Sequence, residues 1–383
     1  MKPLVTLLLS LLLLACASAP PRSHSDAQLQ QLLASDHGQQ QPLNLQNAQL
    51  AGIDWSGRTL SFVDLAQSNL RGANLAGATL QNVNLHNADL RHANLRGTRF
   101  VQVDLSAANL SESQLAQASF VNCKLKHSNF SEAQAPGSEF SDNQGNNANF
   151  SEANLQSAQL NNNRFEHSLW MYANLTGIHI SNTDLRYAQM LSVRLDNAQI
   201  NRTDLYNAKL DYSHLDNASI VDSHLRAADL SYCSAEHSKF DGTIMIGARM
   251  NSCKLAHSSY VASDAREVAF VDVDLRNANF SQARLEQARF DWSKLYDARF
   301  EQADLLKASF TRSDARRANF NDASLRWTTL TLSNLAGASF NNADMEKTDL
   351  QGADVAASNF TGARNMDRLF GWEKARHTDQ AQR

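Results

Sequence analysis

The chain has 383 residues, 43% of them apolar, so it is long enough to bury a large core. Charged residues make up 19%, below the usual quarter, and the formal net charge at pH 7 is −4. So small a net charge argues against a strongly basic nucleic-acid-binding protein and against a heavily acidic mimic of nucleic acid.

The first 15 residues have the pattern of a targeting signal. Lys2 precedes an almost wholly apolar run from 4 to 14, which is too short to span a bilayer permanently as a helix. The run ends Leu13-Leu14-Ala15-Cys16, which resembles a bacterial lipobox. The resemblance implies that residues 1–15 are a lipoprotein signal peptide and that Cys16 becomes an acylated N-terminus. An ordinary secretory signal, cut near residues 17–19, is the alternative.

Lipidation at Cys16 would place the protein in the cell envelope of a Gram-negative bacterium. Several acyl chains hold a protein stably on a membrane, because each buried CH₂ contributes about 0.8 kcal/mol. The residue after Cys16 is Ala17 rather than Asp. By resemblance to enterobacterial sorting, this favours the periplasmic face of the outer membrane.

Two short segments separate this signal from the main body of the chain. Residues 16–25 contain Pro20-Pro21 and small polar residues, which predict a flexible tether. Residues 26–42 predict a capping helix, because Leu29, Leu32 and Leu33 fall on one helical face and a Gly follows as a stop signal. A longer tether is the alternative for residues 26–42.

From residue 45 to residue 360 the chain follows a five-residue pattern. One large apolar residue falls on every fifth position, a small residue stands two positions earlier, and Asp or Asn often comes between them. The large residues of the clearest stretch are Leu65, Leu70, Leu75, Leu80, Leu85, Leu90, Leu95 and Phe100. The frame holds for about 64 units, which is the signature of a repeat architecture.

This pattern resembles the pentapeptide-repeat family, whose consensus is A-(D/N)-L-x-x. The resemblance implies an all-β fold, a right-handed quadrilateral parallel β-helix in which four repeats make one coil and residues 20 apart stack. Residues 43–362 would then form about 16 coils that rise about 4.8 Å each, with short caps at both ends. Phe recurs at every tenth position from 270 to 320, so two opposed faces are expected to carry Phe and the other two Leu or Ala.

Some positions depart from the pattern. Arg58 stands where a small inward residue is expected, which predicts a distorted first coil. Asn143 and Asn163 stand at small inward positions one coil apart, which predicts a buried amide ladder. Gly145 replaces a large apolar residue, which predicts a local distortion, either a kink that serves a partner contact or only the repair of a poor coil.

The five-residue frame ends at Asn365. Met366, Leu369, Phe370 and Trp372 follow as an apolar cluster, which predicts a C-terminal cap. Residues 363–383 are therefore expected to be a cap with a disordered tail, which begins at residue 373.

The sequence contains no motif for catalysis or for a cofactor. No insertion interrupts the repeats, and no nucleophile elbow, phosphate-binding loop or zinc signature occurs, so we expect neither an enzyme nor a cofactor. Cys123, Cys233 and Cys253 fall at small inward positions and are expected to be buried free thiols, with a disulfide between the last two as the alternative. A metal site that combines these thiols with His237 and His257 is not favoured, because the two His side chains are expected to point outward.

One outward row of residues is a candidate binding surface. Tyr172, Tyr212, Tyr232 and Trp292 differ by multiples of 20, so we expect them along one edge of the solenoid. Aromatic residues in a row on a rigid surface are typical anchors for a protein or glycan partner. The alternative is a chance alignment of surface aromatic residues.

Together these features predict a non-enzymatic, membrane-anchored interaction scaffold of the cell envelope, a rigid rod whose flat faces bind an unknown protein or glycan. The alternative is a topoisomerase-binding nucleic-acid mimic, as in the pentapeptide-repeat proteins that protect against quinolones. The signal peptide and the small net charge count against this alternative, and no nucleic-acid partner is expected. An enzyme or a toxin domain delivered by the solenoid ranks last.

Overall fold

The computed structural model of the protein describes residues 42–383. The expected signal peptide, Cys16, the tether and all but the last residue of the expected capping helix lie outside the described residues. The chain divides into two compact units, with unit 1 ending at Leu169 and unit 2 beginning at Trp170.

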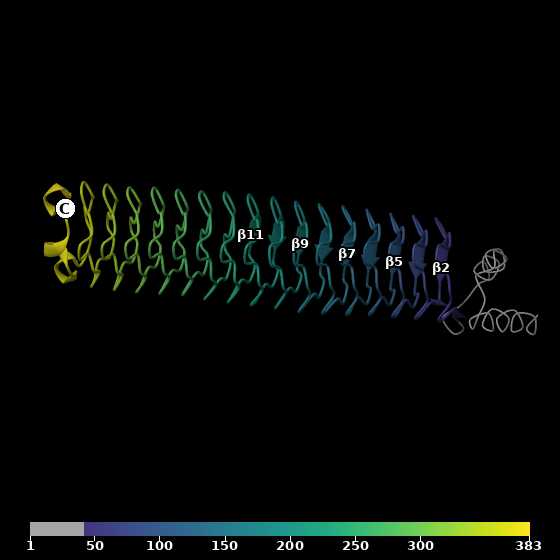
Figure 1. Ribbon diagram of the computed structural model, residues 1–383. Helices are drawn as coiled ribbons and strands as arrows, with labels where there is room; N and C mark the ends of the chain where they lie inside the picture. Colours follow the sequence, from purple (N-terminus) through teal and green to yellow (C-terminus); the bar gives the residue numbers. More distant parts are fainter. Residues whose placement is uncertain (1–41) are drawn as a thin grey trace, which may run out of the picture. The chain divides into compact units, whose positions relative to one another are not determined.

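Unit 1 is built from short parallel strands, one above the other. They are β1 (Leu43–Asn44), β2 (Thr59–Ser61), β3 (Val63–Asp64), β4 (Thr79–Gln81), β5 (Arg99–Val101), β6 (Ser119–Val121), β7 (Glu139–Ser141) and β8 (Gln159–Asn161). Strand β1 pairs with β3, and β2, β4, β5, β6, β7 and β8 follow one another in a parallel ladder (Figure 1). Every pairing joins residues 20 apart, as between Leu80 and Phe100.

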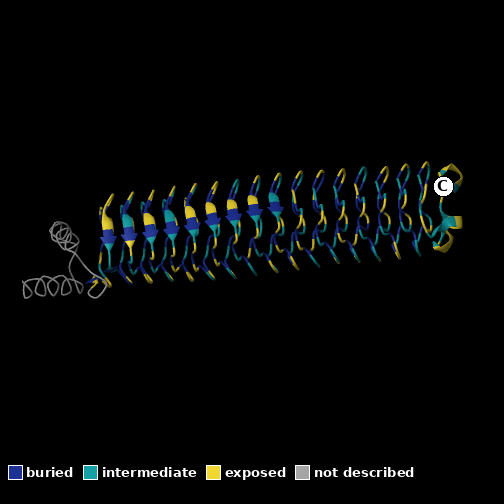
Figure 2. Ribbon diagram, turned by 180° about the vertical axis from the view of Figure 1, so that it is seen from behind, coloured by how far each residue is buried: buried dark blue, intermediate teal, exposed yellow. Residues whose placement is uncertain are grey.

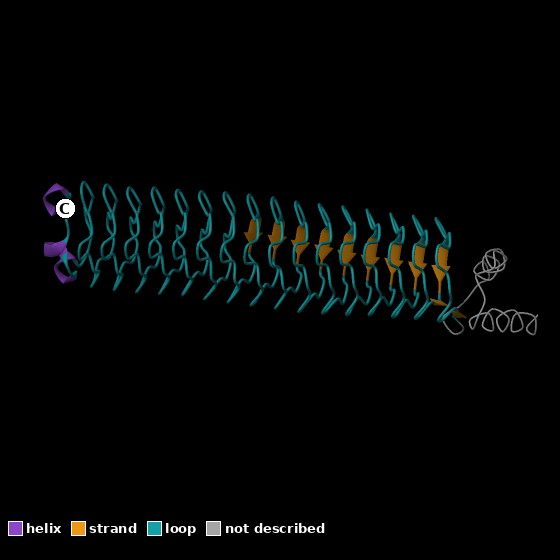
Figure 3. Cartoon of the chain, viewed as in Figure 1, coloured by secondary structure: helices purple, strands orange, loops and turns teal. Residues whose placement is uncertain are grey.

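Unit 2 continues the same plan with fewer regular strands. Strands β9 (His179–Ser181), β10 (Gln199–Asn201) and β11 (Ser219–Val221) pair in parallel with the same spacing. After β11, single bridges join residues 20 apart as far as Asp344 and Arg364, and Figure 3 accordingly draws this part mostly as loop. The parallel all-β solenoid is confirmed, although strands of three residues mark only nine coils of the described chain.

Each repeat consists of a short straight piece and a turn at a corner of the coil. In the repeat around Leu85, the N–H of Ala88 donates to the Leu85 carbonyl (3.0 Å) and closes the turn. Asn87, at the third position of this turn, has a φ of 57°. Such left-handed backbone favours Gly, Asn and Asp, which explains why these residues recur at the corners. The N–H of Leu85 donates to the Asp104 carbonyl of the next coil (2.7 Å), so neighbouring coils are bonded together.

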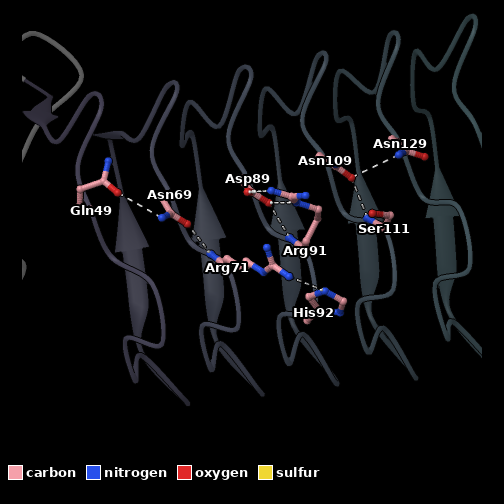
Figure 4. A network of polar contacts seen from close by, with 9 residues as sticks. All are labelled: Gln49, Asn69, Arg71, Asp89, Arg91, His92, Asn109, Ser111 and Asn129. Carbon is pink, nitrogen blue, oxygen red and sulfur yellow. Dashed lines mark hydrogen bonds and ion pairs between the residues drawn. The ribbon is translucent and has the colours of Figure 1, made fainter.

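The Asp or Asn that precedes the large residue supports both the turn and the stacking. The side-chain oxygen of Asn69 accepts the N–H of Arg71 two residues ahead (3.1 Å). The Asn69 amide also donates to Gln49 one coil earlier (3.1 Å), and Figure 4 shows this row of polar side chains along unit 1. In the same row Asp89 forms an ion pair with Arg91 (2.6 Å). Where Asp or Asn stands at this position, it therefore stabilises both the turn and the stacking of the coils.

The core of each unit is filled by the small and large residues of every repeat, so buried and exposed residues alternate along the chain (Figure 2). In unit 2, Phe280 and Phe300 stack with ring centroids 5.0 Å apart and planes 2° apart. Phe290 meets Phe280 edge-on from the opposite face, at 5.4 Å and 84°. The two opposed columns of Phe are confirmed, and edge-to-face contacts join them.

The buried amide ladder expected in unit 1 is also confirmed. The Asn143 side-chain amide donates to the Asn163 side-chain oxygen (2.9 Å) and to the Phe120 carbonyl (3.0 Å). The Asn163 amide in turn donates to the Phe140 carbonyl (2.9 Å). Both Asn side chains are buried, and these bonds remove most of the cost of burying an amide.

The structure shows no kink at Gly145, and of the two alternatives for residues 133–146 it has the local repair, because the next coil fills the space. The Gly145 N–H donates to the Arg164 carbonyl (2.7 Å) and its carbonyl accepts the Ala148 N–H (3.0 Å), as in the other repeats. A Cβ on Gly145 would lie 2.3 Å from Cε1 of Phe165, so the Phe165 ring occupies the place of the missing side chain. The pair keeps the core filled and the backbone regular.

The first coil is also more regular than expected. Asp54 bridges Asn74 with the usual spacing of 20 residues, and Trp55 fills the inward position with 1% of its surface exposed. Arg58 lies at the surface rather than in the core. The expected distortion is therefore limited to one side chain that turns outward, where its charge remains hydrated.

The C-terminal residues change from five-residue to six-residue units. Three 3₁₀ helices, η2 (Met366–Arg368), η3 (Trp372–Lys374) and η4 (Thr378–Gln380), each follow a residue with left-handed backbone (Figure 3). The Trp372 ring packs edge-on against Phe360 at 5.4 Å, and so covers the last core Phe. Phe370 is 52% exposed and lies outside this apolar contact, although its backbone bridges Asp349.

The tail from residue 373 is bonded to the last five-residue coil, whereas we expected disorder. The Gln382 N–H donates to the Ser358 carbonyl (2.8 Å), and the Phe360 N–H donates to the Gln382 carbonyl (2.7 Å). Arg376 makes the equivalent pair of bonds to Ala353 (2.8 Å) and Val355 (3.1 Å). The tail can be polar, because backbone hydrogen bonds rather than buried apolar side chains hold it in place.

Gly145→Ala is expected to lower the free energy of unfolding by about 1–3 kcal/mol, because the new methyl group clashes with the Phe165 ring. Combined with Phe165→Leu, the change should cost less than the sum of the two single substitutions, since the smaller side chain makes room. Urea unfolding of the four proteins, followed by circular dichroism, measures this coupling. Strictly additive costs would contradict the packing described for Gly145.

Candidate functional site

The four aromatic residues expected along one edge occupy the same place in their turns. Tyr172, Tyr212, Tyr232 and Trp292 all lie in unit 2, with φ values between 60° and 64°. Each backbone N–H donates to a carbonyl of the next coil, at 2.8–3.0 Å. Between 53% and 60% of each residue is exposed. We call these four residues the aromatic lane.

Aromatic side chains are unusual at this place in the turn. Left-handed backbone suits Gly, Asn and Asp, and a bulky residue there is an outlier. The strain costs on the order of 1 kcal/mol for each residue. Because more than half of each aromatic residue is exposed, burial offsets little of this cost. Strained residues that gain little from the fold are concentrated at binding sites and active sites.

Tyr212 and Tyr232 form a stacked pair on adjacent coils. Their ring centroids are 4.9 Å apart and their planes differ by 7°. Since the coils stack in the same direction as the rings, the outer face of Tyr212 points towards Ser192, one coil earlier. The outer face of Tyr232 points towards Ser252, one coil later. Within residues 42–383 no cation–π contact involves the tyrosines of the aromatic lane, and the small side chains of Ser192 and Ser252 stand beside these outer faces.

Trp292 lies on the same edge but is separated from the tyrosines. Ser252 and Asp272 occupy the two coils between Tyr232 and Trp292. Arg312 covers one face of Trp292, with its Cζ 4.6 Å from the ring centroid. The structure therefore places all four predicted residues on one edge but brings only Tyr212 and Tyr232 into contact.

Two further aromatic residues, which the spacing of the aromatic lane does not select, carry a cation on other edges of unit 2. Lys347 Nζ lies 4.0 Å from the ring centroid of Trp327, and Arg317 Cζ lies 4.4 Å from that of Tyr296. A search along a single edge could not find them. The available signal is an aromatic residue followed 20 positions later by a basic one, as in Trp327 and Lys347.

The three described cysteines are buried free thiols in the structure. Burial raises the pKa of Cys123 to about 12 and raises the pKa of Cys233 above its ordinary range, so both thiols are neutral and unreactive. The Cys233 thiol donates to the sulfur of Cys253 at 2.9 Å. His237 and His257 stack on each other with ring centroids 4.7 Å apart.

Within residues 42–383, no three His, Cys, Asp or Glu side chains are arranged to hold a metal ion. Many ion pairs of unit 2 join an Arg to a neighbouring Asp or Glu, as between Asp274 and Arg276 (2.7 Å) and between Glu346 and Arg326 (3.2 Å). Pairs of this kind contribute little to stability and show a solvated face. The aromatic lane is thus the feature that the fold explains least.

Tyr172→Asn is expected to raise the free energy of unfolding by about 0.5–1 kcal/mol, because Asn adopts left-handed backbone at a lower cost. In Tyr212→Asn, loss of the stack with Tyr232, worth about 0.5–1.5 kcal/mol, should cancel that gain. Urea and thermal unfolding measure both changes. A clear loss of stability in Tyr172→Asn would show that the fold itself needs the ring.

Comparison with known proteins agrees with the repeat geometry. A model of pentapeptide repeats (8 copies) matches residues 59–97, 173–211, 218–256, 262–291, 293–331 and 330–364, and a model of a pentapeptide repeat region matches residues 113–190. No curated protein matches the chain.

Solved structures similar to the chain include QnrB1, a plasmid-mediated fluoroquinolone resistance protein. The match has 21% sequence identity and a TM-score of 0.26, and it covers 60% of this chain and 90% of QnrB1. HetL, a pentapeptide repeat protein involved in heterocyst differentiation regulation from Nostoc sp. strain PCC 7120, matches at 19% identity, 86% of this chain, 93% of that chain and a TM-score of 0.18. A pentapeptide repeat protein of the Arabidopsis thaliana thylakoid lumen matches at 28% identity, 28% of this chain, 69% of that chain and a TM-score of 0.20. Because the family models cover more than half of its residues, the chain belongs to the pentapeptide-repeat family.

Proposed function

We propose that the protein is a non-enzymatic interaction scaffold, anchored to a membrane through Cys16, that binds its partner with the aromatic lane. The observation that carries the proposal is the combination of backbone strain and exposure at Tyr172, Tyr212 and Tyr232. These tyrosines cost conformational free energy and bury little surface in return. A binding role accounts for their presence.

The proposed mechanism is recognition by a surface that is ordered before the partner arrives. Each backbone N–H of the aromatic lane is already bonded to the next coil, so binding costs little backbone entropy. A Tyr side chain has only two rotatable angles and offers both an apolar ring and a hydroxyl group, which gives contact area at low entropic cost. Trp292, with one face covered by Arg312, belongs to the margin of this surface.

A scaffold rather than an enzyme is supported by the way in which the surface is made. In each unit the side chains stand in rows set by the repeat, and the described repeats run without a long loop. Catalytic groups are usually gathered by loops that a rigid framework positions. Membership of a repeat family built as scaffolds supports the same conclusion.

The membrane anchor is proposed from the sequence. The lipobox-like Leu13-Leu14-Ala15-Cys16 supports cleavage before Cys16 and acylation of its thiol and amino group. Within residues 42–383, no helix has the length and apolar character needed to cross a bilayer. Acyl chains on Cys16 would hold the solenoid at the periplasmic face of the outer membrane, where it meets a protein or glycan of the envelope.

The mature protein, isolated from membranes, is expected to begin at Cys16 and to carry acyl chains, and Cys16→Ser protein is expected in the soluble fraction. Intact-mass spectrometry and cell fractionation test both. Cys123→Ala is the matched control, because it removes a buried thiol and leaves the signal unchanged. An unacylated N-terminus in the wild type would refute the anchor.

A triple variant, Tyr172→Asn with Tyr212→Asn and Tyr232→Asn, is expected to bind its partner at least about tenfold more weakly, since buried aromatic anchors contribute most of the binding energy of an interface. Affinity purification from membranes, with quantitative mass spectrometry, measures the loss. Trp327→Asn is the matched control, because Trp327 has the same left-handed backbone, with a φ of 58°, on another edge. An unchanged set of partners in the triple variant would reject the aromatic lane as the binding surface.

A further inference from the structure

The aromatic lane lacks a ring at one position between two tyrosines. Tyr172, Ser192 and Tyr212 stand on three successive coils of unit 2, all with left-handed backbone and φ values of 62°, 55° and 60°. The Ser192 N–H donates to the Asp211 carbonyl (3.0 Å), so the coil at Ser192 is bonded in the usual register. The backbone at Ser192 is therefore the same as at its neighbours, and only the aromatic side chain is missing.

The spacing of the coils determines what fits between the two rings. Tyr172 and Tyr212 are two coils apart, about 9.6 Å at the usual strand spacing. Tyr212 lies with its face along the direction of stacking, because it is parallel to Tyr232 at 4.9 Å. Its other face is open towards Ser192, and Tyr172, 60% exposed, projects from the same corner on the far side. One ring inserted at Ser192 would contact a tyrosine on each side.

The surroundings of Ser192 are mixed in polarity. Leu191 lies beside it and is half-buried, Asp211 follows on the next coil, and Arg194 is exposed on the adjoining face. A guest that is apolar throughout would remove the Asp211 carboxylate and the Ser192 hydroxyl from water without replacing their hydrogen bonds, which is costly. The guest therefore needs apolar faces and a rim of hydroxyl groups.

A hexopyranose ring has this combination of surfaces. Its C–H groups form apolar faces that stack on aromatic rings, and its hydroxyl groups stand around the rim, where Ser192, Arg194 and Asp211 can donate to or accept from them. At the usual coil spacing, a ring inserted at Ser192 would have its centre about 4.8 Å from each tyrosine, close enough for its C–H face to pack on both.

We propose that the Ser192 position binds one neutral hexopyranose ring of a glycan chain, sandwiched between Tyr172 and Tyr212. The proposal rests on the proposed function, in which the aromatic lane is the binding surface. The open face of Tyr232 at Ser252 provides a second contact three coils away from Ser192, about 14 Å at the usual spacing. Only a chain of several sugar rings reaches both, so an oligosaccharide should bind more tightly than a monosaccharide.

The test places an aromatic side chain at Ser192, so that the proposed sugar site is filled. Isothermal titration calorimetry on the detergent-solubilised full chain uses three neutral hexasaccharides as probes: the β-1,4-linked N-acetylglucosamine hexamer, cellohexaose and maltohexaose. Ser192→Tyr completes the column of rings with a residue that this turn already accepts at Tyr172, Tyr212 and Tyr232. It is expected to weaken hexasaccharide binding at least tenfold, while the matched Ser192→Asn stays within threefold of the wild type.

Each outcome decides between the explanations. Equal or tighter binding of a hexasaccharide by Ser192→Tyr would overturn insertion at Ser192. The sugar would then bind to aromatic surface in general and would not need the gap between the two tyrosines. Failure of all three hexasaccharides to bind the wild type would overturn the assignment of a glycan as the ligand. If the triple tyrosine variant still lost its partners, the aromatic lane would instead bind a peptide. If Ser192→Tyr fails to fold by circular dichroism, Tyr212→Asn replaces it, and unchanged hexasaccharide binding by that variant would also overturn the proposal.

Discussion

The ladder of backbone hydrogen bonds between neighbouring coils is the constraint on which the structure depends. In unit 2, the Leu205 N–H donates forward to the His224 carbonyl (2.7 Å), and the His224 N–H donates back to the Thr203 carbonyl (2.9 Å). A third bond comes from the left-handed corner, where the Asn207 N–H donates to the Arg226 carbonyl (3.0 Å), and together these bonds keep residues 20 apart in contact. The neighbours of any side chain are consequently the residues 20 positions before and after it, and stability is a property of adjoining coils.

This constraint confines variation to the outward positions. Inward residues must fill the core, and the Asp or Asn that often precedes the large residue supports its turn. The left-handed corner residue points outward and can be almost any residue that tolerates the backbone. The corners use many residue types, among them Asn, Gly, Gln, Glu and His, so the tyrosines of the aromatic lane stand out by their alignment and their exposed rings. The same argument gives Trp327, with Lys347 over its ring, less weight as a binding residue.

Features that depend only on the spacing of 20 residues could be predicted from the sequence. The stacking of Phe280 on Phe300, the ladder of Asn143 and Asn163, and the placement of the aromatic lane on one edge are of this kind. Features that depend on how a side chain tilts within the core could not be predicted from this spacing. No spacing rule shows that Phe165 leans into the place left by Gly145.

Two further misses have their own physical reasons. Arg312 covers Trp292 because a cation and a ring one coil apart attract each other, and the analysis of the sequence considered aromatic residues alone. The residues from 373 onward lack the five-residue apolar period, so the sequence predicts disorder there, although their backbone is bonded to the last five-residue coil. For the candidate site, the sequence was sufficient to select the edge but not to show which rings are open.

The six-residue units also change what the last coil offers to another polypeptide. Successive bridges there join residues 21, 22 and 23 apart, from Asp349 with Phe370 to Asn359 with Gln382, while the preceding bridges keep a constant step. An exposed strand edge in perfect step with a partner is a template for aggregation. A turn whose step lengthens from 21 to 23 residues presents an edge that is out of register with the constant step of 20, so a strand of another chain with that constant step would not pair with it along its whole length.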